Sequence, residues 1–338
     1  MGLGRWRVGR GTNLALLVVI LLAVATGALA FAIGGGWAWW VVAAHGAAGL
    51  AIVLLAPWKT AISARGIRRR RSGSVASVAL AMLVLIAVTS GVAHAVGWWT
   101  GTLAMQVHVG AALGSIPLVA WHVVARPVRP RKTDLSRRSL LRGAALAGGS
   151  LATLGGVEAF VRVAGLPGAE RRFTGSYERG SFDPDRMPVT QWLDDEIPRV
   201  DAGLWRLEVR SLAATRTWTF DELLGFGDEI RGVLDCTGGW FASQEWSGVR
   251  VDRLLEPDPD ARSFVAVSVT GYARRLPIVE ASRVLLATRV GGLPLSAGHG
   301  YPLRLVAPGR RGFWWVKWVE RIEASSTPWW WQSPFPLT

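Results

Sequence analysis

Residues 11–57 read GTNLALLVVILLAVATGALAFAIGGGWAWWVVAAHGAAGLAIVLLAP and contain no Asp, Glu, Lys or Arg. Helices of soluble domains need a polar face, so a stretch without these charges predicts helices that are apolar all round. A bilayer is crossed by about 20 apolar residues. The stretch therefore predicts two transmembrane helices, over residues 13–33 and 37–57, joined by a short glycine turn at residues 34–36.

Two further apolar runs, residues 75–96 and 101–124, are also long enough to span a bilayer. Basic residues lie between the runs, in one loop over residues 59–71 and another over residues 126–138. This distribution is typical of the cytoplasmic loops of membrane proteins. It accounts for the net charge of +14, so we expect membrane lipid as a partner and no nucleic acid.

A fifth candidate helix follows the basic segment Leu135-Ser-Arg-Arg-Ser-Leu-Leu-Arg142. Arg137 and Arg138, followed by leucines and the weakly apolar residues 143–161, resemble a twin-arginine export signal. An ordinary basic loop before a fifth helix is the alternative. Both interpretations place the two arginines in the cytoplasm and the chain after about residue 165 outside it.

Four of the five histidines lie in the predicted helices: His45, His94, His108 and His122. An ionisable group in a membrane segment suggests function, and imidazole is a common axial ligand of haem. On the predicted topology His45 and His108 lie at similar depth near the outer face, so we predict that they bind one haem b. His94 and His122 are alternative ligands. The alternative roles are hydrogen bonding across helices or, for His94 and His122, a simple position in the membrane interface.

Beyond about residue 165, charged residues are spread regularly, and Pro and Gly separate short segments. Strands are predicted over residues 205–211, 232–236, 263–269, 303–306 and 314–322, and a short helix over residues 219–224. Such a mixture predicts an α+β domain.

The predicted protein is thus a multi-pass protein of the cell membrane with three parts. A four-helix transmembrane domain covers residues 1–125, and a cytoplasmic basic loop with a fifth helix covers residues 126–164. An extracytoplasmic α+β domain covers residues 165–338.

Val233-Leu-Asp-Cys-Thr-Gly-Gly-Trp240, followed by Trp246-Ser-Gly-Val249, resembles the cysteine segment of the sulfite oxidase family. Residues 298–309, GHGYPLRLVAPG, followed by Trp315-Val-Lys-Trp318, resemble the second cofactor-binding segment of that family. The two blocks have the order and separation found there, and the resemblance covers residues 182–338. It implies a molybdopterin-binding fold and an oxidoreductase close to the bacterial methionine-sulfoxide reductase branch.

The same resemblance assigns roles to single residues. Cys236 matches the cysteine that binds molybdenum together with the two pterin sulfurs, and a thiolate suits such a soft site. A small buried hydrophobic side chain is the alternative role for a lone cysteine. The cofactor-binding candidates are His299, Arg304 and Lys317 for the pterin or its phosphate, Trp315 and Val316 through backbone groups, and Thr270 near the metal.

The substrate is expected to differ from sulfite. Animal and plant sulfite oxidases have an arginine soon after the cysteine, whereas residues 237–241 here read TGGWF, and no separate dimerisation domain follows Lys317. We therefore expect oxygen-atom or two-electron transfer on a small molecule such as a sulfoxide or N-oxide. Electrons would be exchanged with the membrane through haem b, with a quinone or another membrane electron carrier as a candidate partner. The alternatives are a non-catalytic membrane protein and a haem-only electron carrier with a cofactor-free domain.

Overall fold

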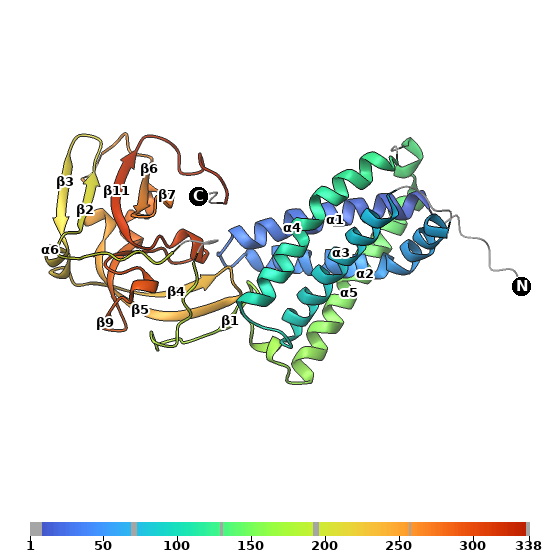
Figure 1. The fold of residues 1–338 in the computed structure, drawn as a ribbon, viewed down its shortest axis with the longest axis horizontal. Coiled ribbons are helices and arrows are strands. Elements are labelled where there is room, and N and C mark those ends of the chain that lie inside the picture. The colour runs from blue at the N-terminus through green and yellow to red at the C-terminus, as the bar shows by residue number, and fades with distance from the viewer. Residues whose placement is uncertain (1–8, 69–72, 129–130, 192–195, 257, 336–338) are drawn as a thin grey trace, which may run out of the picture. The chain divides into compact units, whose positions relative to one another are not determined.

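A computed structural model describes residues 9–68, 73–128, 131–191, 196–256 and 258–335. It divides the chain into two compact units. The first contains Met1–Phe31 and Gly36–Gly175, and the second contains Ala32–Gly35 and Ser176–Thr338. Figure 1 shows the helices and strands of both units, with labels on most of them.

Long helices make up most of the first unit. They are α1 (Arg10–Ala32), α2 (Ala38–Arg68), α3 (Ser74–Val96), α4 (Thr102–Ala125) and α5 (Arg137–Val163), with short 3-10 turns at Lys132–Leu135 and Pro167–Glu170. All five of these helices in the described chain are long and apolar enough to cross a membrane. The five predicted helices are therefore confirmed. Arg5, Arg7 and residues 69–71 and 129–130 of the predicted basic segments lie outside the described residues.

The largest difference from the predicted bounds is at α2, which was expected to end at Pro57 and continues to Arg68. A proline removes one amide donor from a helix. Helices that cross membranes nevertheless tolerate it, because neighbouring groups satisfy the freed carbonyl. The basic residues after Pro57 thus begin as part of the helix and not as a loop.

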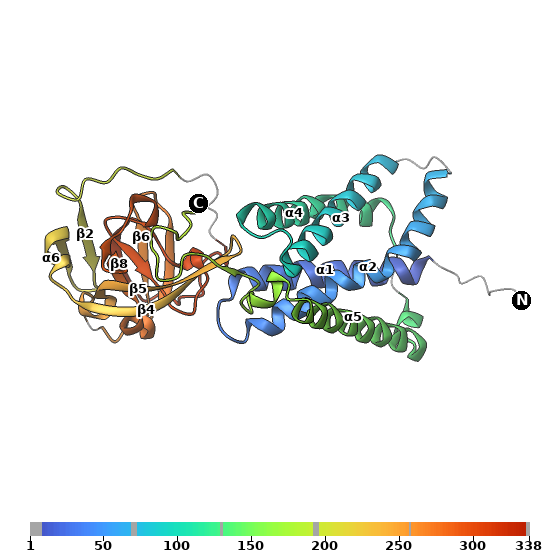
Figure 2. The ribbon, with the colours of Figure 1, turned by 90° about the horizontal axis from the view of Figure 1, so that it is seen from below.

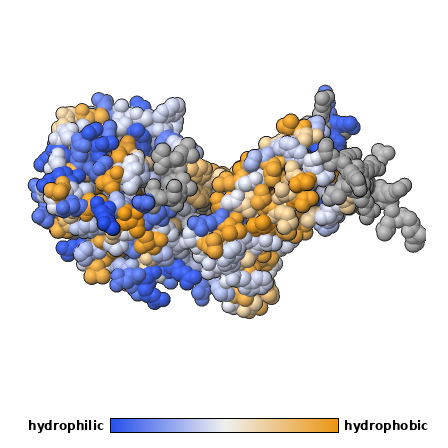
Figure 3. All heavy atoms as spheres, in the orientation of Figure 1, coloured by the Kyte–Doolittle hydropathy of each residue, from blue (hydrophilic) through white to orange (hydrophobic). Residues whose placement is uncertain are grey.

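The helices expose apolar side chains. At most 17% of the apolar span of any of the five is buried inside the protein. Val18, Val75 and Leu103 are each more than 60% exposed, and Figure 3 shows hydrophobic residues spread over the helical surface. Such an exterior is compatible with insertion into a membrane, where apolar side chains face lipid.

Small residues dominate the packing within the first unit. Val19 of α1 forms a buried cluster with Ala48 and Ala51 of α2, and Leu146 of α5 packs against it. Figure 2 shows α3 and α4 running side by side. Small side chains allow helix backbones to approach closely in membrane proteins.

Polar contacts hold the loops next to the helices. Arg10 at the start of α1 forms an ion pair with Asp134, just before α5, at 2.5 Å. Ser136 caps α5 by accepting a hydrogen bond from the backbone N of Ser139. After α5, Arg171 forms an ion pair with Glu158 and donates to the carbonyl of Ala95, which ties this segment to the end of α3.

Two β-sheets form most of the second unit. The described part of the first sheet has the order β1-β5-β8-β10, with β4 beside β5 and β9 beside β8, and the second has the order β3-β2-β11-β6-β7. The first contains β1 (Tyr177–Glu178), β4 (Asp228–Cys236), β5 (Trp240–Arg250), β8 (Leu285–Val290), β9 (Leu293–Pro294) and β10 (Arg304–Val306). The second contains β2 (Arg206–Arg210), β3 (Thr215–Thr219), β6 (Ser263–Ser268), β7 (Ala273–Pro277) and β11 (Val319–Ser325), and the short helix α6 (Phe220–Leu224) follows β3.

Buried side chains alternate along β2, β5, β6 and β7, whereas β8 and β10 are buried on both faces. Trp246, Leu286 and Leu305 are fully buried in the first sheet, and Phe264 and Ile322 in the second. Alternation of this kind is what a strand with one face against a core requires. The antiparallel pairing of β4 with β5 places Cys236 opposite Trp240, at the end of the hairpin.

The α+β class predicted for this region is confirmed, as are the strands over residues 205–211, 232–236, 263–269 and 303–306 and the helix over 219–224. The prediction of a strand over residues 314–322 was wrong for its first half. Gly312–Trp314 is a 3-10 turn, and β11 begins only at Val319. The backbone N of Trp315 donates to Gly312 O instead of to a neighbouring strand, so the aromatic run is fixed by a local turn and by side-chain packing.

Candidate functional site

The single cysteine of the chain lies at the end of β4, where a glycine turn begins. Gly239 has a φ of 85°, a conformation that glycine adopts without strain. Cys236 Sγ accepts a hydrogen bond from the backbone N of Gly238 at 3.3 Å and lies 3.3 Å from Thr190 Oγ1. Cys236 is free and only partly buried. A partly exposed thiol with polar neighbours can serve as a soft metal ligand once it loses its proton.

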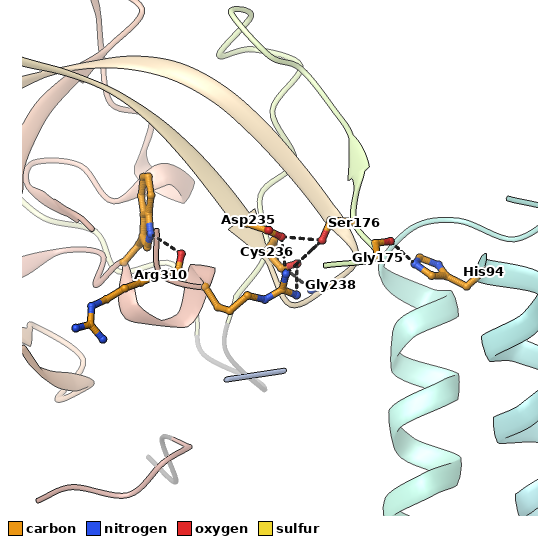
Figure 4. A network of polar contacts seen from close by, with 9 residues as sticks. His94, Gly175, Ser176, Asp235, Cys236, Gly238 and Arg310 are labelled. Carbon is orange, nitrogen blue, oxygen red and sulfur yellow. Dashed lines mark hydrogen bonds and ion pairs between the residues drawn. The ribbon is translucent and has the colours of Figure 1, made fainter. Parts of the chain in front are cut away.

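A buried ion pair lies directly beside this cysteine. Arg311 Nη1 donates to Asp235 Oδ1 at 2.6 Å, and its Nη2 donates to the carbonyl of Cys236 at 3.2 Å. Ser176 Oγ donates to the same carboxylate at 2.7 Å (Figure 4). Both charged side chains are at most 5% exposed. Burial of an ion pair costs desolvation energy, so the pair by itself is weak evidence for stability. Its clear structural effect is that Arg311, through its bond to the Cys236 carbonyl, fixes the backbone of the cysteine.

Arg304 at the start of β10 is a buried cation. Its side chain donates from Nη1 to the carbonyl of His299 at 3.0 Å, and its Nε has no partner among the described residues. Burial lowers the pKa of the Arg304 guanidinium to about 10, an effect that the nearby Cys236 opposes. The guanidinium thus stays charged at neutral pH. The described residues contain no ion pair of Arg304, although its guanidinium lies over the rings of Trp246 and Trp315.

Lys317 and His299 hold the segment that leads to Thr190. Lys317 Nζ donates to the carbonyls of Gly298 at 2.6 Å and Thr190 at 2.8 Å. His299 Nε2 donates to the carbonyl of Met187 at 3.1 Å, while its Nδ1 accepts from Ser296 Oγ at 2.9 Å. These two bonds fit the neutral imidazole. Burial, with the positive charges of Arg304 and Lys317, lowers the pKa of His299 to about 4.

Unusual backbone conformations bring Arg304 and Lys317 near each other. Gly300 has a φ of 108°, and a Cβ there would lie 3.2 Å from the Cβ atoms of both Arg304 and Lys317. Trp318 has a φ of 52°, which is unusual for a bulky residue. Its Nε1 donates to the carbonyl of Ala297 at 2.7 Å, which holds the residue in place. Strained positions of this kind are concentrated at ligand sites.

The structure therefore brings four predicted site residues into one region: Cys236, His299, Arg304 and Lys317. Trp315 and Val316 are buried beside them, and the carbonyl of Val316 pairs with the amide of Leu305. Thr270 lies in the turn after β6, where its hydroxyl contacts Ser268 at 3.2 Å. Its neighbour Val269 donates to the carbonyl of Trp318, which attaches this turn to the region.

Two surface hollows open beside Tyr301. One of about 590 Å³ is lined by Ile197, Arg199 and Ala297, and one of about 360 Å³ by Arg206 and Phe220. Ala297 begins the 3-10 turn that carries His299. The first hollow therefore shares a wall with the segment that holds the histidine.

The first unit contains a separate histidine arrangement. His45 of α2 and His108 of α4 have ring centroids 5.8 Å apart with perpendicular planes. His45 Nδ1 is 2.9 Å from the carbonyl of Ala23, and His108 Nδ1 is 2.7 Å from the carbonyl of Ala87. Since each Nδ1 is used by a carbonyl, Nε2 is the nitrogen of each ring left to bind a metal.

Glycines make room for these two rings in the same way. A Cβ on Gly27 of α1 would lie 3.0 Å from His45 Cε1, and a Cβ on Gly91 of α3 would lie 2.9 Å from His108 Cε1. Gly27 lies one helical turn after Ala23, whose carbonyl contacts His45. Gly91 lies one helical turn after Ala87, whose carbonyl contacts His108. The hairpins α1–α2 and α3–α4 thus present their histidines through the same local arrangement.

The other two helical histidines have different surroundings. His94 at the end of α3 is buried, and its Nε2 donates to the carbonyl of Gly175 at 2.9 Å (Figure 4). His122 lies near the end of α4 beside the ring of Trp121, with 6.2 Å between centroids. The structure therefore pairs His45 with His108 and does not pair His122 with another histidine.

Several residues of the cysteine region were not predicted from the sequence: Ser176, Thr190, Asp235 and Arg311. Asp235 lies inside the first predicted block, where a charge within an apolar strand is a usable signal, and Arg311 follows the second block. Ser176 and Thr190 lie far from Cys236 in the chain. No local pattern distinguishes them from surface hydroxyl residues, because their role depends on tertiary contacts.

Comparison with known proteins gives matches for this part of the chain. Residues 194–332 match the family model described as the oxidoreductase molybdopterin binding domain. A protein of Azospira oryzae named as a protein-methionine-sulfoxide reductase subunit, YedZ1, is 29% identical over 176 residues, which cover 46% of this chain and 67% of that protein.

Mitochondrial sulfite oxidases are similar over shorter parts. The enzyme of Homo sapiens is 38% identical over 163 residues, covering 37% of this chain and 30% of the enzyme. The enzyme of Rattus norvegicus is 31% identical over 113 residues, covering 29% of this chain and 20% of the enzyme. The chain thus spans less than a third of the length of these oxidases. The crystal structure of the sulfane dehydrogenase SoxCD from Paracoccus pantotrophus aligns with a TM-score of 0.37 and 26% identity, over 39% of this chain and 40% of that one.

Proposed function

Because its C-terminal unit belongs to the sulfite oxidase-type family of molybdenum oxidoreductases, we propose that this protein is a membrane-anchored enzyme that transfers an oxygen atom or two electrons to or from a small molecule. Reduction of a sulfoxide or N-oxide is the favoured reaction. The name of the YedZ1 relative supports a sulfoxide as the substrate class.

The observation that carries this proposal is the buried Arg304. A guanidinium that is 3% exposed and has an unpartnered Nε in the described chain is costly without a counter-charge. A pterin phosphate would supply that charge, and an arginine binds phosphate through paired donors. Lys317 lies close enough to add a second positive charge. His299, whose two ring nitrogens are bonded within the protein, would hold the backbone beside the phosphate. The residues present therefore fit the molybdenum cofactor.

Cys236 would bind the metal of this cofactor. When bound, the cofactor supplies a molybdenum atom able to exchange an oxygen atom and two electrons. The protein's part is to hold the thiolate in place, through Gly238 at the sulfur and Arg311 at the carbonyl. Trp315 and Val316, both at most 2% exposed, close the region to water.

The substrate preference follows from the residues after the cysteine. Residues 237–241 offer no basic side chain to hold a sulfite anion. Trp240 is 3% exposed and packs within β5, so it belongs to the core and not to an open anion site. An uncharged sulfoxide needs no cationic partner, which favours reduction of a neutral substrate over oxidation of sulfite.

Haem b between His45 and His108 is the proposed electron relay in the first unit. His45 and His108 would hold the haem iron through their Nε2 atoms, because each Nδ1 already contacts a backbone carbonyl. Their ring centroids lie 5.8 Å apart. No third His, Cys, Asp or Glu of the described residues joins them. A pair of ligands suits haem, because the macrocycle supplies the other four nitrogens.

The proposed location has the helices in the cell membrane and the C-terminal unit on the extracytoplasmic side. The positively charged loops would lie in the cytoplasm, with Arg137 and Arg138 acting as a twin-arginine export signal. A quinone or another membrane electron carrier is the proposed electron partner of the haem.

The proposal is tested on the full-length protein purified in detergent. We expect molybdenum and haem to be present, and reduced dye to be oxidised when a sulfoxide or N-oxide is added. Cys236→Ser should remove this activity and leave the haem spectrum unchanged. Protein without molybdenum but with haem would support an electron carrier with a cofactor-free domain, and would contradict the proposed enzyme.

A further inference from the structure

A threonine outside the predicted site contacts the sulfur of the proposed metal ligand. Thr190 Oγ1 lies 3.3 Å from Cys236 Sγ. These residues are far apart in sequence. Tertiary structure alone brings the hydroxyl to the sulfur.

The backbone of Thr190 is held by two of the proposed cofactor-binding residues. Its own carbonyl accepts from Lys317 Nζ at 2.8 Å, and three residues earlier the carbonyl of Met187 accepts from His299 Nε2 at 3.1 Å. Pro188, between the two, restricts the backbone further. The hydroxyl is therefore presented to the sulfur by an anchored segment.

Chemistry decides the direction of this hydrogen bond. A free thiol can either donate or accept. A thiolate bound to a metal has no proton, so it can only accept. The Thr190 hydroxyl would then be the donor, as the backbone N of Gly238 already is at 3.3 Å. Two donors would thus face the sulfur that binds the metal.

We propose that Thr190 is a positioning residue that acts through Cys236 and raises the reduction potential of the bound metal. A hydrogen bond to a thiolate withdraws electron density from the sulfur, and such bonds are among the factors that set metal potentials. The sulfur then stabilises the oxidised metal less. This inference rests on the proposed function, since it requires molybdenum bound by Cys236.

The test is a redox titration of the molybdenum signal, measured by electron paramagnetic resonance on the full-length protein. Thr190→Val, which keeps the shape and removes the hydroxyl, should lower the reduction potential. Thr190→Ser, which restores the hydroxyl, should return it to the wild-type value. Thr217→Val on the exposed strand β3 is the matched control and should leave it unchanged.

Other outcomes overturn the inference. A Thr190→Val protein that contains molybdenum with an unchanged reduction potential would contradict the proposed role of Thr190. If the Thr190→Val protein does not retain molybdenum, the reduction potential of Thr190→Ala is compared with that of the wild type instead. Loss of molybdenum from both, or from Thr190→Ser, would show that the side chain retains the metal and does not tune it. A wild-type protein without molybdenum would instead refute the proposed function.

Discussion

Asp235 is a buried carboxylate whose counter-charge is Arg311, next to the proposed metal ligand. In Asp235→Asn the guanidinium stays buried without that charge, which costs about 3 kcal/mol or more. We expect the free energy of unfolding to fall by about 3 kcal/mol, measured by urea denaturation of the purified protein in detergent.

The control is an ion pair of the same kind on the surface. Arg231 and Glu245 pair across β4 and β5, with side chains 68% and 63% exposed. Water screens such a pair, so Glu245→Gln should change the free energy of unfolding by less than about 1 kcal/mol. Equal losses in the two variants would show that burial of Asp235 does not matter.

His299 makes the stability of the cofactor-free protein depend on pH. Its pKa is lowered from 6.5 to about 4, first by burial and then by the charges of Arg304 and Lys317. Between these values the unfolded chain binds a proton that the folded chain does not, so stability falls as pH falls from 6.5 to 4. The loss should approach roughly 3 kcal/mol. Urea denaturation across this range, on protein from cells that cannot make the cofactor, measures it.

A glutamine in place of the histidine separates this effect from other titrations. His299→Gln keeps a donor and an acceptor but does not titrate. The slope of stability against pH between 4 and 6.5 should decrease in this variant. If the slope is the same as in the wild type, His299 is not the group responsible.

The site residues found from sequence alone are those whose neighbours in the chain carry a pattern. Cys236 lies between a strand and a glycine turn. Arg304 lies inside a glycine-rich block, and Lys317 lies inside an aromatic block. Thr190 and Ser176 have no such surroundings, because their partners are set by the fold. Local sequence therefore predicts the residues that are proposed to bind the cofactor, whereas tertiary structure shows the residues that hold them in place.

At the scale of elements, two glycines decide how the helical histidines are held. In Gly91→Ala the new methyl group on α3 would lie 2.9 Å from His108 Cε1, so the ring must move. We expect loss of haem, or a shifted spectrum, in reduced-minus-oxidised difference spectra. Gly143→Ala on α5, where nothing lies within 4 Å, should bind haem normally. A Gly91→Ala protein with full haem and an unchanged spectrum would contradict the proposed role of His108.

Helices were predicted well and strands less completely. The helices follow from uninterrupted apolar runs, which the membrane requires for reasons independent of packing. Strands β1, β3, β5, β7, β8 and β9 were not predicted. β5 alternates buried and partly exposed residues, but the polar Gln244 on the buried face and the aromatic Phe241 on the other face hide the apolar period. Gln244 is fully buried and donates to the carbonyl of Gly180, a contact that no local pattern reveals.

At the scale of the whole molecule, the proposed export route makes a prediction about location. Arg137 and Arg138 begin α5 directly after its cap, Ser136. If they form a twin-arginine signal, changing both to lysine should keep the C-terminal unit in the cytoplasm. Protease added to spheroplasts should then digest that unit in the wild type but not in the variant. Arg142→Lys is the control, and equal digestion in all three proteins would exclude this signal.

The central claim is that the sulfur of Cys236 binds molybdenum. X-ray absorption at the molybdenum edge counts the sulfur atoms around the metal in the purified full-length protein. We predict that Cys236→Ser has one sulfur fewer than the wild type, with the pterin sulfurs unchanged. The same number of sulfurs in both proteins would contradict the account.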